Sequence, residues 1–76
     1  MSHYTIRHAD THEPLSIGGP YDRGKAVSIL LMRSHARVNG KDRVFVRSEW
    51  YVTEWDDADE EILSQMSADE FVGEYR

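Results

Sequence analysis

Residues 43–55 read RVFVRSEWYVTEW, and this stretch decides the fold class. β-branched and aromatic side chains suit the pleated surface of a sheet, and their alternation with polar residues is typical of a strand. One face takes Val44, Val46, Trp50 and Val52, and the other takes Phe45, Arg47, Glu49, Tyr51, Thr53 and Trp55. The stretch is long for a single strand, so we expect a bulge, a bend or a tight turn near Ser48-Glu49.

A helix is predicted before this strand, over residues 23–38. Asp22 is a favourable N-cap, because its carboxylate can accept the free N–H groups of a first helical turn. The apolar residues that fall on one face at helical spacing are Val27, Leu30, Leu31 and Val38. Asn39-Gly40 is interpreted as the end of the helix, although the same pair could form a hairpin turn.

The two ends of the chain complete the predicted elements. His3–His8 alternates as a half-buried strand, residues 10–14 carry turn chemistry, and residues 15–17 could pair back as a hairpin. Asp57-Ala58-Asp59-Glu60 and Ser67-Ala68-Asp69-Glu70 resemble capping boxes, so each is expected to open a helix.

These elements predict an α+β fold with the order β-β-α-β-α-α. We expect a small antiparallel sheet of about three strands with helices packed on one face. The 76 residues are expected to form a single domain over 1–76, because the chain is shorter than most domains. The C-terminal part, about residues 56–76, is expected to be an acidic helical segment.

Composition argues against several classes of protein. The longest apolar run, residues 29–32, is far shorter than the roughly 20 residues that a membrane span needs. The absence of cysteine excludes disulfide bonds, thiolate metal sites and cysteine nucleophiles. The first residues lack the basic and apolar regions of a signal peptide, so we expect a cytoplasmic protein. We expect no membrane association. We also expect no cofactor.

Charge is divided unevenly along the chain, which carries a net charge of −5. Residues 1–53 hold eight basic and five acidic side chains, whereas residues 54–76 hold one basic and nine acidic side chains. A basic middle is thus followed by an acidic end, and each could attract a partner of the opposite sign.

Three apolar residues of the predicted helix lie off its main apolar face. Ile29, Met32 and Ala36 follow helical spacing on roughly the opposite side. A helix that is apolar on two sides is buried on two sides or contacts a partner. This surface is therefore predicted either to pack against the C-terminal helices or to bind a protein, including a second copy of the chain.

A run of carboxylates follows the central strand: Glu54, Asp56, Asp57, Asp59, Glu60 and Glu61. On a rigid helix these side chains could dock on a basic partner or mimic a phosphate backbone. The alternative is ordinary helix chemistry, in which acidic first-turn residues offset the helix dipole and the rest are solvated. The run lacks the ligand spacing of a calcium loop.

Basic and aromatic residues gather in the middle of the chain: Arg33, Arg37, Arg43, Arg47, Tyr51 and Trp55. On one face of a sheet, such side chains could stack on the bases of a single strand and neutralise its phosphates. Strand aromatics in a small domain more often pack within the fold, and the net negative charge argues against a dedicated nucleic-acid binder.

The sequence predicts neither a metal site nor a catalytic set of residues. His3, His8, Asp10 and His12 are metal-ligating residue types, but their spacing does not aim three ligands at one ion, so surface histidines are predicted. The serines lack a nucleophile elbow, and Gly18-Gly19-Pro20 lacks the lysine of a phosphate loop. Enzymatic activity is therefore not expected.

Two short motifs carry a resemblance to other proteins. Tyr4-Thr5-Ile6-Arg7 and Gly19-Pro20-Tyr21-Asp22, followed by an alanine-containing helix, resemble small uncharacterised open reading frames of actinobacteria and their phages. The arginine-to-lysine ratio of seven to two agrees with such a source. The resemblance covers about the first 35 residues and implies no activity. Small phage proteins commonly bind and modulate a host or phage protein.

The function predicted from these observations is a non-enzymatic interaction or regulatory module. It would bind a protein partner, or a second copy of itself, through the helix surface of Ile29, Met32 and Ala36 and through the acidic run from Glu54 to Glu61. The alternatives are a nucleic-acid-binding regulator that uses the basic and aromatic residues, and an acidic phosphate-mimicking inhibitor of a nucleic-acid-binding protein.

Overall fold

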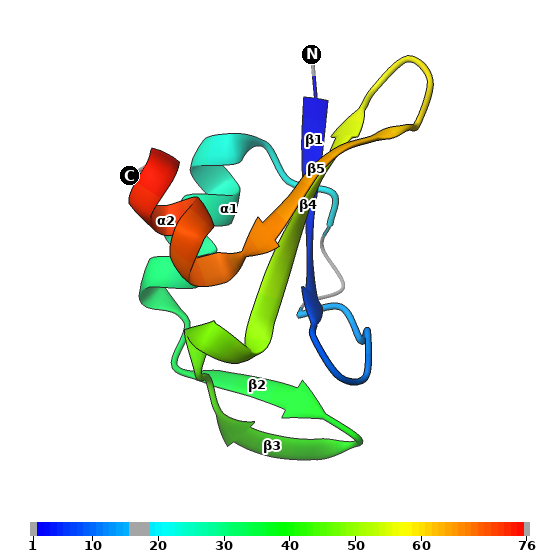
Figure 1. Cartoon of the computed structure of the whole chain (residues 1–76). Helices are drawn as coiled ribbons and strands as arrows, with labels where there is room; N and C mark the ends of the chain where they lie inside the picture. The colour runs from blue at the N-terminus through cyan, green and yellow to red at the C-terminus, as the bar shows by residue number, and fades with distance from the viewer. Residues whose placement is uncertain (1, 16–18, 76) are drawn as a thin grey trace.

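A computed structural model describes residues 2–15 and 19–75 of the chain. The elements are β1 (Ser2–His8), α1 (Arg23–Met32), β2 (His35–Val38), β3 (Lys41–Val44), the 3-10 turn η1 (Arg47–Glu49), β4 (Trp50–Asp56), β5 (Ile62–Ser67) and α2 (Ala68–Tyr75). Strands β1, β4 and β5 form one antiparallel sheet in the order β1-β4-β5, and β2 pairs with β3 in a separate hairpin. Both helices lie on the same side of the three-stranded sheet (Figure 1).

The predicted α+β class and the small antiparallel sheet of three strands are confirmed. The predicted order β-β-α-β-α-α is wrong, because the described elements follow the order β-α-β-β-β-β-α. Three stretches account for most of the difference. The single strand expected over residues 43–55 is divided into β3 and β4, with η1 between them. Residues 35–38, expected at the end of a helix, form β2, and residues 62–66, expected within a helix, belong to β5.

Helix α1 begins where it was predicted but ends six residues early. The carboxylate of Asp22 accepts the backbone N–H of Lys25 at 2.7 Å, which confirms the N-cap. Beyond Met32 the backbone is extended at Arg33, and burial then alternates along β2. Asn39 and Gly40 both have positive φ, 54° and 75°, as a two-residue hairpin turn requires. Their interpretation as a helix end is therefore wrong, and the hairpin alternative is right.

The acidic residues that were expected to open a helix form a tight turn between β4 and β5. The Asp56 carboxylate accepts the backbone N–H groups of Ala58 at 2.8 Å and Asp59 at 3.1 Å. The backbone N–H of Asp56 also donates to the carbonyl of Glu61 at 2.9 Å. A side chain that can cap a helix can equally cap a turn, and here the turn returns the chain alongside β4. The acidic helix expected from about residue 56 thus begins only at Ala68.

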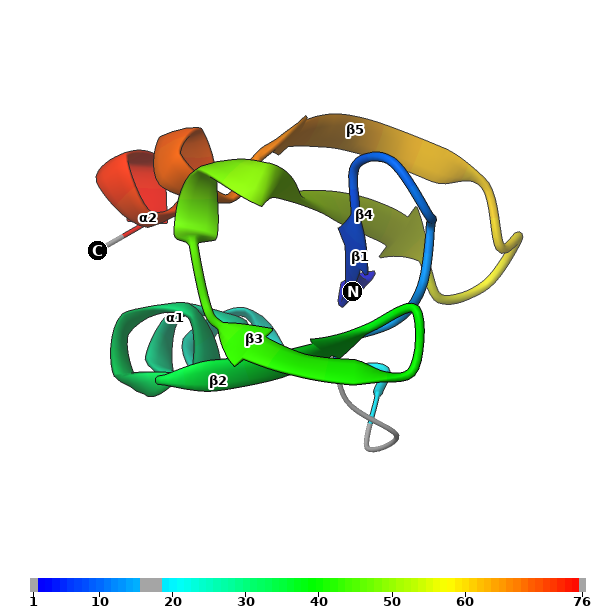
Figure 2. The same cartoon turned by 90° about the horizontal axis from the view of Figure 1, so that it is seen from below.

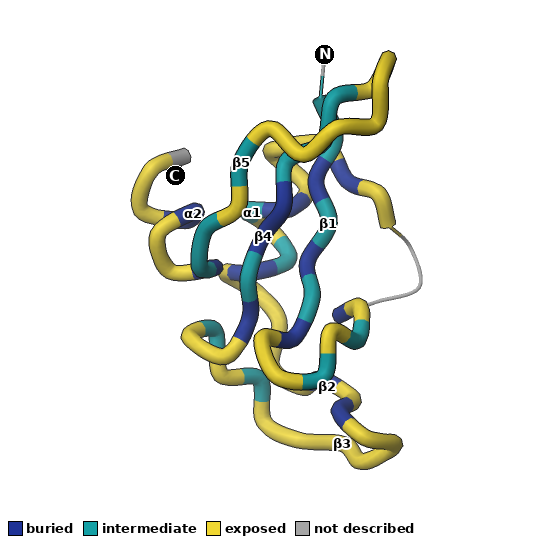
Figure 3. The backbone as a smooth tube through the Cα atoms, turned by 45° about the vertical axis from the view of Figure 1, so that its right-hand side comes forward, coloured by how far each residue is buried: buried dark blue, intermediate teal, exposed yellow. Residues whose placement is uncertain are grey.

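The core lies between the sheet and the two helices. Trp50 and Val52 of β4 are buried with Ile6 of β1, as the alternation predicted, and Figure 3 shows this burial along both strands. Val44 and Val46 were assigned to the same face as Trp50 and Val52, but they are 70% and 44% exposed. The assignment fails because η1 breaks the stretch where a break was expected, and β3 belongs to the hairpin.

Two further predictions concern the ends of the chain, namely the cap of α2 and the return of the chain towards β1. The hydroxyl of Ser67 accepts the backbone N–H of Glu70 at 3.2 Å, which confirms the second capping interaction. The predicted return towards the first strand is seen where the N–H of Leu15 donates to the carbonyl of Ile6 at 3.0 Å. The rest of that expected strand, Ser16 and Ile17, lies outside the described residues. Among the described residues, no helix is long and apolar enough to span a membrane.

Candidate interaction surfaces

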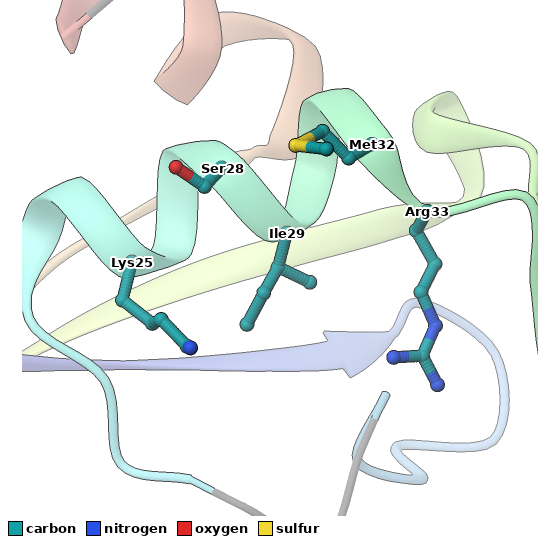
Figure 4. A pocket seen from close by; sticks show the side chains of 5 residues that line it. All are labelled: Lys25, Ser28, Ile29, Met32 and Arg33. Atoms are coloured by element: carbon teal, nitrogen blue, oxygen red, sulfur yellow. The ribbon is translucent and has the colours of Figure 1, made fainter.

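Helix α1 carries a shallow, open groove of about 280 Å³ on its solvent side. Its lining residues are Lys25, Ser28, Ile29, Met32 and Arg33, and we call it the α1 groove. Figure 4 shows Lys25, Ile29 and Arg33 projecting to one side and Ser28 and Met32 to the other. Side chains four residues apart form ridges on a helix, and the hollow between two such ridges is where another element packs.

The sequence of α1 leaves apolar side chains uncovered on this side. Within the helix only Ala26 and Leu30 are buried, whereas Ile29 is half-buried against the core. Met32 is 82% exposed, although a methionine gains free energy when it is removed from water. The predicted off-face surface is therefore exposed at Met32, whereas Ile29 lies between this surface and the core. The surface does not include Ala36, which is buried on β2 because the helix ends before it.

The charge of the α1 groove is positive. The Cα atoms of Lys25 and Arg33 are separated by about 12 Å along the helix axis, at roughly 1.5 Å per residue. Ile29 lies midway between them. Residues 23–33 include no acidic side chain, and the carboxylate at the Lys25 end is that of Asp22, which caps the helix. The Nε atom of Arg33 donates to the carbonyl of His35 at 3.0 Å, and its other guanidinium N–H groups have no partner within the part of the chain that the structure describes. The groove therefore suits a segment with aliphatic side chains and nearby carboxylates.

Half of the predicted acidic run is used within the fold. The Glu54 carboxylate accepts hydrogen bonds from the hydroxyls of Ser2 at 2.7 Å and Ser64 at 3.2 Å. Asp57 contacts the Nδ1 atom of His3 at 2.6 Å. The backbone N–H groups of Asp59 and Ala58 hold the pKa of Asp56 below its ordinary value, because they stabilise the carboxylate form.

The other half of the acidic run is exposed next to apolar residues. Asp59, Glu60 and Glu61 are exposed and form no ion pair with another described residue. Ile62 and Leu63, which follow directly, are 54% and 52% exposed. We call residues 57–63 the acidic-apolar segment. Ile62 and Leu63 fell within the helix expected to open at Asp57, and nothing in the sequence signalled that they would be exposed on a strand.

The cationic residues predicted to bind nucleic acid do not share one surface. Arg33 lies beside α1, and Arg47 bonds the carboxylate of Asp69 in α2 at 2.6 Å. In the hairpin, Ala36 is paired with Arg43 and Arg37 with Asp42. Because neighbouring residues of a strand point to opposite faces, Arg37 and Arg43 lie on opposite faces of the hairpin.

The two predicted aromatic residues lie on the three-stranded sheet, away from most of these cations. Tyr51 hydrogen-bonds His12 at 3.0 Å, and the Trp55 indole N–H donates to the hydroxyl of Thr5 at 2.9 Å. The Trp55 ring is also stacked on His3. These contacts fit the packing interpretation of the strand aromatics.

The histidines are not equivalent, and one of them was placed wrongly. His8 was predicted to be a surface residue, but it is buried, with its ring edge-on to Trp50 at 5.0 Å between centroids. Its Nδ1 atom accepts the backbone N–H groups of Asp10 and Thr11 and so holds the turn after β1. Among residues 2–15 and 19–75, no group of three His, Cys, Asp or Glu side chains could hold a metal ion.

Comparisons of this chain with protein-family models, with curated proteins and with solved structures returned no match. The resemblance to reading frames of actinobacteria and their phages therefore stays a prediction.

Proposed function

We propose that the chain is a non-enzymatic interaction module that binds a protein segment in the α1 groove. The observation that carries this proposal is the exposure of Met32, 82% of its surface, beside the half-buried Ile29 in a lined hollow. A single exposed apolar side chain is ordinary on a protein surface. A hollow with two apolar side chains can bury apolar side chains of a ligand. The cation at each end can fix the direction in which an acidic ligand binds.

The chemistry of the groove defines the class of partner. A bound segment would place one or two aliphatic side chains against Ile29 and Met32, and carboxylates against Lys25 and Arg33. The apolar contact would supply most of the affinity, because exposed charge pairs contribute little. The charges would select the partner and speed its approach. In the setting that the phage resemblance implies, the partner would be a host or phage protein with a regulatory role.

The nucleic-acid alternative has less support. Its cations are divided between α1, the two faces of the hairpin and an ion pair with Asp69. Its aromatic residues are engaged with histidines and Thr5 on the other sheet. The inhibitor alternative loses three of its six carboxylates to internal contacts at Glu54, Asp56 and Asp57.

A pair of labelled peptides tests the proposal. In one, Ile-Leu follows a run of glutamates, and in the other the glutamates are replaced by lysines. We expect the acidic peptide to raise the fluorescence anisotropy on binding, and the basic peptide to leave it unchanged. Met32→Glu is expected to abolish the binding, and Val44→Glu, at another exposed position in the hairpin, to preserve it. Equal binding of both peptides, or equal losses in both variants, would contradict the proposal.

A further inference from the structure

We propose that the occupant of the α1 groove is the acidic-apolar segment of a second copy of the chain, so that copies associate head to tail. This inference rests on the function proposed above, because it uses the same groove. It adds the identity of the bound segment, residues 57–63, which read DADEEIL.

The acidic-apolar segment has the composition that the groove requires. Ile62 and Leu63 are about half exposed, and three exposed carboxylates precede them at residues 59–61. The register of β5 against β4 shifts at this point: Trp55 is paired with Ile62 and Glu54 with Ser64. Leu63 is therefore the extra residue of a bulge, and bulges turn a side chain away from the regular sheet.

The turn before these residues presents them in a fixed shape. Asp56 holds the backbone on both sides of the turn through the N–H groups of Ala58 and Asp59 and through its own N–H to Glu61. An ordered loop loses less conformational entropy on binding than a flexible one. The segment can therefore bind as it stands.

The segment cannot fill the groove of its own chain. Figures 1 and 2 both place the turn between β4 and β5 beyond the far end of the sheet, on the side away from α1. The contact is therefore between copies. It joins two different surfaces, so each copy can use its groove for one neighbour and its segment for another. Such an interface adds copies head to tail and gives a ring or an open filament according to its rotation.

The basic hairpin is the competing site for the acidic-apolar segment. Lys41 and Arg43 are exposed there, and Val44 is 70% exposed. The hairpin, however, does not contribute to the lining of the groove, where aliphatic side chains can be removed from water. Substitutions in the hairpin therefore serve as matched controls for substitutions in the groove.

Sedimentation velocity of the full chain tests the inference. A contact of one loop with one shallow groove is small, so the measurement uses a high protein concentration, about 0.5 mM. We expect the wild-type chain to form dimers and larger species. Met32→Glu blocks the groove and Leu63→Glu blocks the segment, so each variant is expected to sediment as a monomer. Both side chains are at least half exposed, and circular dichroism checks that the fold is retained.

Mixing the two blocked variants gives the decisive result. The Met32→Glu chain keeps its segment and the Leu63→Glu chain keeps its groove, so the mixture is expected to form a one-to-one dimer and nothing larger. Val44→Glu introduces the same charge in the hairpin and is expected to associate as the wild type does.

Four results would overturn the inference: a monomeric wild type, a mixture that stays monomeric, a Leu63→Glu variant that still associates, or a Val44→Glu variant that does not. The peptide experiment separates this failure from failure of the proposed function. If the wild type is monomeric but binds the acidic peptide in a Met32-dependent way, the groove is an interaction site for another protein. If neither association nor peptide binding occurs, both proposals fail.

Discussion

The backbone N–H of Asp10 donates to the Nδ1 atom of His8 at 3.2 Å, so a buried ring at the end of β1 holds the turn that follows it. Thr11 donates to the same atom at 3.4 Å. One side chain thus satisfies two backbone donors and packs edge-on against Trp50.

Replacement of His8 by leucine should destabilise the fold. The substitution removes the acceptor and leaves two backbone N–H groups without their partner, which costs about 1–3 kcal/mol. Urea unfolding of the variant and of His12→Leu, whose ring is exposed, measures the difference. An equal effect of both substitutions would show that the Nδ1 contacts contribute nothing.

The two glycines Gly40 and Gly73 should respond to alanine in opposite directions. Gly40 has a φ of 75°, so Gly40→Ala forces a side chain into the left-handed region and should lower stability by about 1 kcal/mol. Gly73 lies in α2 with open space around its Cα, so Gly73→Ala should raise stability by about 0.5–1 kcal/mol. Thermal unfolding of both variants checks the signs. A Gly40→Ala variant as stable as the wild type would contradict the strain expected at this turn.

Removal of the Tyr21 hydroxyl should not destabilise the protein. This hydroxyl is buried and has no hydrogen-bond partner among residues 2–15 and 19–75, so Tyr21→Phe should leave stability unchanged or raise it by up to about 1 kcal/mol. The Tyr4 hydroxyl donates to Glu54 at 3.3 Å, and Tyr4→Phe should lower stability. Denaturant midpoints of the two variants provide the comparison. A larger loss at Tyr21 than at Tyr4 would contradict the assignment.

The turn between β4 and β5 should weaken in acid. The pKa of Asp56 is lower in the folded chain than its ordinary value of 3.8, so near that pH the unfolded chain binds more protons. Stability from this group is therefore complete above pH 3.8 and falls as the pH drops through the folded pKa. Asp56→Asn keeps an acceptor oxygen but does not titrate, so its stability should depend less on pH in that range. Identical acid profiles would show that Asp56 does not contribute.

Local chemistry explains which elements could be predicted from the sequence. The side chains of Asp22 and Ser67 cap the nearest backbone N–H groups, and this contact needs no other part of the fold. Apolar and polar residues alternate in β1 and around Trp50 and Val52, and this pattern likewise fits only a strand. These are the places where the predicted and observed elements agree.

The errors occur where one short pattern fits two structures. Ala36 and Val38 continue a helical face and also alternate as a strand does, and only the pairing of β2 with β3 decides between them. The acidic residues from Asp56 to Glu60 can cap either a helix or a turn. They form a turn here because the chain that follows pairs with β4 as β5. The turn leaves Ile62 and Leu63 exposed on β5, and the pairing of β2 with β3 removes Ala36 from the predicted surface, so the candidate site was only partly predictable.

Because Ser2 is paired with Asp56 and Tyr51 with Ser67, the sheet joins the first residues of the chain to residues near its end. Contacts so distant in sequence slow folding, since a long loop must close before they form. During synthesis, β1 would leave the ribosome before β4 and would have no strand to pair with until β4 had been synthesised. The sheet could therefore form only after β4 had been synthesised, and the unpaired strand β1 would until then be open to wrong pairing.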